Sequence, residues 1–216
     1  MSRHRLHAVA AIAAAAFLFT GCSAPSASDA GSTPAPTATP SPTPTIDPGP
    51  VELTKEEAGE RYLAIVCASN ALGAQMNEQL DEKEAQWLNG KEPNISKIKS
   101  IAAQSIAVDR LGIELFDDPY YIWPSSVAAH IRTVRDAFVA EQGTLDTIAN
   151  AKNFKTIYNV TWPDSGSAPQ EIRYQLGLST DTTASCAGKD KLLDGLHAEM
   201  VARTEYLAQF LEPDED

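Results

Sequence analysis

The chain has 216 residues, a formal net charge of −12 at pH 7, three cysteines and 14 prolines. Such an acidic chain is repelled by phosphate groups, which excludes nucleic acid as an expected partner. Many of the prolines lie before residue 51, whereas residues 51–216 are long enough for one domain with a sizeable hydrophobic core.

Residues 1–21 are organised like an export signal. Arg3 and Arg5 precede an uncharged apolar run from Ala8 to Phe19. This run has the length of a signal-peptide core and is too short for a bilayer-spanning helix. Removal of this segment would change the net charge from −12 to −14, because it contains two arginines and no acidic residue.

The segment ends in Leu18-Phe19-Thr20-Gly21-Cys22. This sequence resembles the lipobox of bacterial lipoproteins, although Phe19 stands where that family commonly has leucine. The resemblance implies cleavage after Gly21 and acylation of Cys22, for example with palmitate. Two acyl chains would anchor the protein stably at the extracytoplasmic face of the cell membrane. The alternative is an ordinary secretory signal that is cleaved near Ala24.

Residues 22–50 are predicted to form a disordered tether. They are rich in proline, serine, threonine and alanine, and Ile46 is their only large apolar residue. Such a stretch cannot bury enough surface to offset the entropy of ordering, so we expect an extended, partly polyproline II conformation. The tether would hold the following domain away from the lipid surface.

Residues 51–211 are predicted to be all-α, an antiparallel bundle of about four main helices with one disulfide. The first helix begins with a capping box of Thr54 and Glu57 and ends near Leu88. Its apolar positions alternate between spacings of four and three, which indicates a face packed in a bundle. These positions are Ala58, Tyr62, Ile65, Ser69, Leu72 and Met76.

The second helix is predicted from Pro93-Asn94 to Asp117-Asp118-Pro119, and the third from Pro124 to about Ile148. An aromatic corner lies between them and consists of Tyr120, Tyr121 and Trp123. We expect this corner to cap the core; the alternative is that it stacks on a ligand.

Residues 151–181 permit two interpretations. Large residues alternate with polar ones over 154–162 and again over 172–178, as in a β-hairpin. Ser167-Ala168-Pro169-Gln170, in contrast, is typical of a helix start. We favour a long connection with one short helix at about 168–178.

The last main helix is predicted from Lys189 to Leu211, before an acidic tail at 212–216. Glu141 interrupts the apolar face of the third helix, and Arg203 interrupts that of the last helix. Glu141 meets Arg203 or His197 if these helices are antiparallel neighbours. The simpler interpretation, which we favour, leaves each side chain at the edge of its face and in water.

Cys67 and Cys186 remain once Cys22 is assigned to the lipid. Because exported proteins meet oxidising conditions, we predict a disulfide between them. Cys67 lies opposite the main apolar face of its helix, so we expect a second, thinner buried face that residues 182–188 cross. A metal–thiolate site is the alternative, but no Cys-x-x-Cys motif or adjacent histidine supports it.

Two further patterns are similar to lipoproteins of actinobacteria. They are Tyr62-x-x-x-x-Cys67-x-x-Asn70 and the run from Ile172-Arg173 to Leu176-Gly177-Leu178. No activity is established for those lipoproteins, so the resemblance implies a location in the cell envelope and no mechanism.

Metal-binding candidates are few. His197 and Glu199 resemble part of the Gly-x-His-x-x-Glu motif of imelysin-like iron-uptake lipoproteins, but here the glutamate is one residue too close. At this spacing the two side chains point about 200° apart on a helix and cannot share an ion. A metal or haem site that uses His197, Glu141 or His130 is therefore the alternative to the leading hypothesis.

Catalytic signatures such as a Gly-x-Ser-x-Gly elbow, a glycine-rich phosphate loop or a His-Glu-x-x-His motif do not occur. We therefore expect no enzyme activity and no cofactor. The leading hypothesis is a non-catalytic envelope lipoprotein that binds or scaffolds a protein or cell-wall partner.

Overall fold

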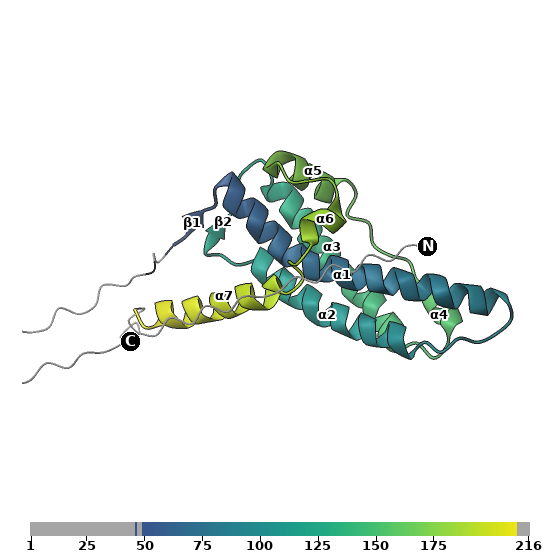
Figure 1. The fold of residues 1–216 in the computed structure, drawn as a ribbon. Helices are drawn as coiled ribbons and strands as arrows, with labels where there is room; N and C mark the ends of the chain where they lie inside the picture. The colour runs from purple at the N-terminus through teal and green to yellow at the C-terminus, as the bar shows by residue number, and fades with distance from the viewer. Residues whose placement is uncertain (1–45, 47–48, 211–216) are drawn as a thin grey trace, which may run out of the picture. The chain divides into compact units, whose positions relative to one another are not determined.

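The computed structural model describes residue 46 and residues 49–210 (Figure 1). The predicted signal peptide, Cys22, nearly all of the tether and the acidic tail lie outside the described residues, so these predictions stay predictions. Within the described residues, no helix has the length and apolar character that a membrane crossing requires.

The all-α prediction is confirmed. The four main helices are α1 (Lys55–Leu88), α2 (Ser96–Phe116), α3 (Ala128–Ala149) and α7 (Leu192–Ala208). The predicted capping box begins α1, since Thr54 Oγ1 accepts a hydrogen bond from the Glu57 amide and the Glu57 carboxylate accepts one from the Thr54 amide. Helix α2 packs against both α1 and α3, and α7 contacts α1 and α2 while its C-terminal end points away from them (Figure 1).

The connection between α3 and α7 contains three short helices, α4 (Phe154–Tyr158), α5 (Ala168–Leu176) and α6 (Thr182–Cys186). The favoured short helix near 168–178 is confirmed as α5, and the hairpin alternative is wrong. The alternation was misleading because Phe154 and Ile157, three residues apart, are both buried on one side of α4.

A two-residue parallel pairing was not predicted. Strand β1 (Val51–Glu52) pairs with β2 (Tyr121–Ile122), and Val51 lies opposite Tyr121. The pairing holds the chain just before α1 against the aromatic corner.

The core has two clusters, and α1 contributes to both. The first lies among α1, α2, α3, α5 and α7 and includes Tyr62, Ile65, Leu115, Ile131, Ile172 and Leu193. The second lies where α1, α2 and α3 meet α4 and includes Leu72, Met76, Ile98, Ile148, Phe154 and Ile157. Each large side chain removed from water contributes about 1.5–3 kcal/mol.

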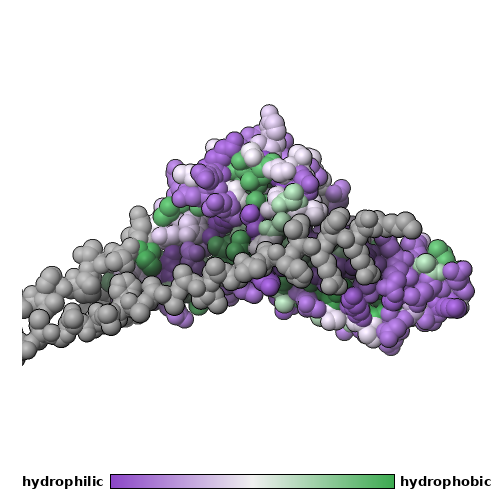
Figure 2. Space-filling model, in the orientation of Figure 1, coloured by the Kyte–Doolittle hydropathy of each residue, from purple (hydrophilic) through white to green (hydrophobic). Residues whose placement is uncertain are grey.

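The predicted apolar face of the last helix is only partly buried. Within α7 the buried residues are Leu193 and Arg203. Leu207 is half-buried, and Phe210, just after α7, is 46% exposed. On the part of the surface that Figure 2 leaves visible, hydrophobic residues form small patches among hydrophilic ones.

The predicted disulfide joins Cys67 of α1 to Cys186 of α6, with an S–S distance of 2.04 Å. It holds α6 against the side of α1 opposite the main apolar face. The second buried face of α1 is confirmed as well, because every residue from 61 to 68 is buried.

Candidate functional site

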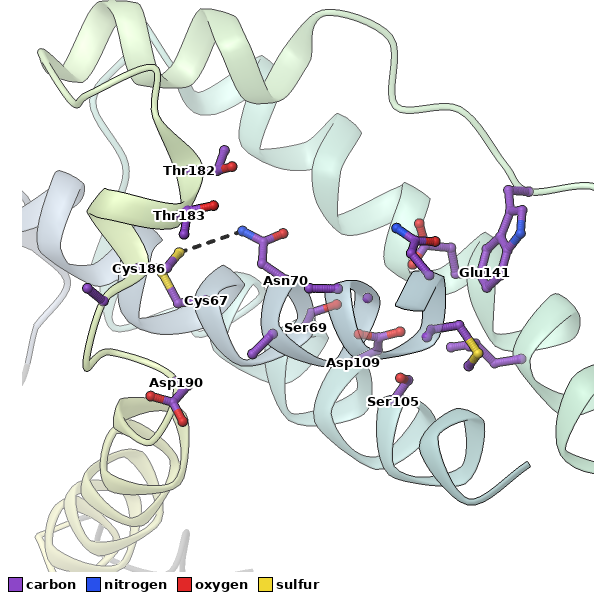
Figure 3. A pocket seen from close by; sticks show the side chains of 18 of the residues that line it. Cys67, Ser69, Asn70, Ser105, Asp109, Glu141, Thr182, Thr183, Cys186 and Asp190 are labelled. Carbon is purple, nitrogen blue, oxygen red and sulfur yellow. Dashed lines mark hydrogen bonds between the residues drawn. A yellow bond between two sulfur atoms is a disulfide. The ribbon is translucent and has the colours of Figure 1, made fainter. Parts of the chain in front are cut away.

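A cavity of about 740 Å³ lies beside the disulfide and is walled by α1, α2, α3 and α6 (Figure 3). Its polar lining includes Ser69 and Asn70 from α1, Ser105 and Asp109 from α2, and Glu141 from α3. The Asn70 amide donates a weak hydrogen bond to the Cys186 sulfur at 3.7 Å, which links the α1 wall to α6.

Asp109 has no exposed surface, and neither of its carboxylate oxygens has a hydrogen-bond partner among the described residues. Burial raises the pKa of Asp109 to about 6. The nearby Ser69 hydroxyl lowers this pKa, although its geometry falls short of a hydrogen bond. An unpartnered buried carboxyl group is rare in folded proteins because its desolvation is costly.

Glu141 approaches the same cavity from α3 and is half-buried (Figure 3). Burial raises the pKa of Glu141, and the negative charge of Asp109 raises it as well. Together the two effects bring this pKa to about 7. The two groups are coupled, because the charge of an ionised Asp109 hinders ionisation of Glu141. Both carboxyl groups therefore change charge near neutral pH.

Sequence reasoning missed Asp109, although a signal was present. Asp109 follows Ser105 by four residues and precedes Gly112 by three, so the helical spacing places it on the same face of α2 as these two buried residues. An acidic residue on such a face is either paired or functional. Glu141 was found by the same signal on α3.

The alternative contact between Glu141 and Arg203 does not form. Arg203 is buried and pairs with Asp118, so the favoured interpretation that Arg203 reaches water is wrong. Its burial became possible because the loop after α2 places a carboxylate beside α7. His197 lies 2.9 Å from the Glu114 carboxylate and not in the cavity.

A second charged cluster involves the aromatic corner. Asp118 Oδ2 accepts hydrogen bonds from Arg61 at 2.9 Å and from Arg203. The Arg61 guanidinium lies 4.2 Å above the Tyr121 ring, and the Arg203 guanidinium lies 4.1 Å above the Tyr120 ring. These two rings therefore pack against buried arginines and help to close the end of the core.

The metal-binding candidates do not form one site. Among residues 46 and 49–210, no three His, Cys, Asp or Glu side chains gather at distances that suit a metal ion. His130 lies half-buried on α3. Ser96 and Lys99 have the spacing of a Ser-x-x-Lys pair, but Lys99 Nζ donates to the Ala151 carbonyl at 3.0 Å.

Comparisons with protein-family models, with curated proteins and with solved structures found no match. Carboxyl pairs with raised pKa values occur in acid–base catalysis. Each Asp109 oxygen here exposes less than 1 Å².

Proposed function

We propose that this chain is a lipid-anchored envelope lipoprotein whose helical domain is a non-catalytic binding module. The lipobox at Leu18-Phe19-Thr20-Gly21-Cys22 and the proline-rich stretch after it support the anchor. The cavity among α1, α2, α3 and α6 supports the binding role. Small-molecule sites typically have volumes of about 300–1,000 Å³, and the cavity of about 740 Å³ falls in this range.

The observation that carries the binding role is the unpartnered Asp109 carboxyl beneath the cavity. A buried carboxyl without partners reduces stability and contributes nothing to the packing of the helices. Groups that cost stability are typical of functional sites, where a ligand supplies the missing interaction. A cell-wall fragment small enough for the cavity would also agree with the hypothesis of a cell-wall partner.

The binding role can be tested with two matched glycine substitutions. Gly73 of α1 lines the cavity, whereas Gly143 of α3 does not, and an added Cβ meets no atom within 4 Å at either position. The full chain would be purified from the envelope in mild detergent and denatured, and released small molecules would be identified by mass spectrometry. We expect wild type and Gly143→Leu to carry one compound that Gly73→Leu lacks.

Two results would contradict this role. One is equal recovery of every compound from wild type and from Gly73→Leu. The other is measured turnover of the recovered compound by the purified chain, which would replace binding with catalysis.

The anchor is tested separately through Cys22. Mass spectrometry of the native protein should show an N-terminal Cys22 that carries acyl chains, and Cys22→Ser should release the protein from the membrane fraction. An unmodified N-terminus downstream of Cys22 would reduce the proposal to a secreted protein.

A further inference from the structure

We propose that the ligand of this cavity is a small organic cation, an alkylammonium or guanidinium compound, whose charged group lies against Glu141 and above Asp109. The inference rests on the proposed binding function and names its ligand class. It is carried by the charge of the described lining, the unpartnered carboxyl beneath it and the mixture of polar and apolar groups around it.

The described lining of the cavity contains three carboxyl groups and no lysine, arginine or histidine. Asp109 comes from α2, Glu141 from α3 and Asp190 from the segment before α7. From α1 the cavity receives no acid or base, because Cys67 is held in the disulfide. Walls of low dielectric concentrate the field of these carboxylates, so the cavity attracts cations and repels anions.

Asp109 distinguishes a cation from a neutral ligand. A neutral, hydroxyl-rich compound would leave the buried charge of Asp109 without a counter-charge. A cation at the cavity floor supplies that counter-charge at short range, where burial weakens the screening by water. Direct contact with Asp109 is not required, since Asp109 is among the residues that line the cavity and its charge acts over a distance.

The groups around the floor suit an N–H donor. The Glu141 carboxylate and the hydroxyls of Ser69 and Ser105 can all accept hydrogen bonds (Figure 3). An ammonium group carries three donors and a guanidinium group five, so either can contact the carboxylate and a hydroxyl together.

The remaining lining suits a short hydrocarbon stem. Met76 and Leu145 contribute apolar surface, and Trp162, which is 41% exposed, contributes an aromatic ring. Aromatic faces also attract cations. The cavity therefore favours a compound with a charged head and an apolar stem.

A bare metal ion fits less well than an organic cation. Calcium takes six to eight oxygen ligands, and zinc takes four ligands of suitable type. No group of three metal-binding side chains lies close together in the described part of the chain.

The inference is tested by calorimetric titration of the full chain in detergent at pH 8. The probes are 1,5-diaminopentane and butylguanidine, with pentane-1,5-diol as the neutral control of matched length. We expect at least one cation to bind about tenfold or more tightly than the diol. Affinity should fall at pH 5, where protonation of Asp109 and Glu141 reduces the attraction.

The variants separate the roles of the two carboxyl groups. Asp109→Asn and Glu141→Gln should each weaken binding of the cation about tenfold or more. Glu78→Gln, an exposed substitution on α1, should leave binding unchanged. Circular dichroism of each variant checks that the helices are intact, and Glu141→Gln keeps the test decisive if Asp109→Asn fails to fold.

Different failures have different meanings. If the diol binds as tightly as both cations and Gly73→Leu abolishes its binding, the charge inference is overturned and the binding function stands. If neither cation binds the wild-type chain, the inference is also overturned. The binding function is then tested only by the recovery of a small molecule from the native protein. Unchanged affinity in both carboxyl variants contradicts the inference as well.

Discussion

Arg61 of α1 and Arg203 of α7 donate hydrogen bonds to the same oxygen of Asp118. Each arginine side chain is only 6% exposed, and that of Asp118 is 3% exposed. Two buried cations in such proximity would repel each other without the shared carboxylate. Because α7 buries few apolar residues, this shared ion pair is a principal attachment of α7 to the other helices.

Replacement of Asp118 by alanine should reduce the free energy of unfolding by about 3–5 kcal/mol, because two buried arginines lose their counter-charge. The neighbouring Asp117→Ala provides the control. Asp117 is 49% exposed and pairs with Arg135 at the surface, so its loss should cost about 1 kcal/mol or less. Urea unfolding monitored by circular dichroism measures both, and equal losses would show that Asp118 has no special role.

Replacement of Asp109 by asparagine should stabilise the protein at high pH. The pKa of Asp109 is about 6 in the folded state, above its ordinary value of 3.8. Between these values the folded state binds more protons than the unfolded state, so stability falls as pH rises from about 4 to about 6. Asparagine does not ionise, and Asp109→Asn should therefore gain up to about 3 kcal/mol at pH 8 and almost nothing at pH 4.

Urea unfolding at both pH values measures this difference, with Glu78→Gln as the exposed control. A gain in stability together with a loss of cation binding would identify Asp109 as a group retained for its ligand. A loss of stability at pH 8 would instead indicate that Asp109 has a structural partner.

Removal of the disulfide should destabilise the protein strongly. Cys67 and Cys186 are 119 residues apart, and in the chain-entropy model a loop of this size is worth about 4–5 kcal/mol. The double variant Cys67→Ala/Cys186→Ala should lose that amount in urea unfolding. A reductant should produce a similar loss in wild type and no change in the double variant. A loss below about 1 kcal/mol would contradict this prediction.

Alanine at Gly73 or at Gly143 should stabilise the helix that contains it. Both glycines lie inside helices, and an added Cβ meets no atom within 4 Å at either position. Each substitution should raise the free energy of unfolding by about 0.5–1 kcal/mol, because glycine loses more backbone entropy on folding. Thermal unfolding measures the shift. If Gly73→Ala alone destabilises the protein, the cavity wall at Gly73 is closer packed than the structure shows.

The sequence by itself determined the four main helices, the short helix α5 and the disulfide, but not the short helices α4 and α6. Apolar spacings of three and four, the capping box at Thr54 and the proline-bounded ends of α2 are local features, which act within a few residues of chain. Once the lipobox had accounted for Cys22, the pairing of Cys67 with Cys186 required only the cysteine count. The sequence left two interpretations of residues 151–181. Their alternating large residues also fit a strand, and only the burial of individual residues distinguishes a strand from a helix.

Only the tertiary structure decided which charged groups meet. Asp109 and Glu141 face one cavity because α2 packs against both α1 and α3, and the spacing of residues within either helix does not specify that arrangement. Arg203 was expected in water and is instead buried, since the loop after α2 presents Asp118 to it. Neighbours that are distant in the sequence decide whether a charged residue on an apolar helix face is buried and which group it contacts. The existence of that face depends on local periodicity.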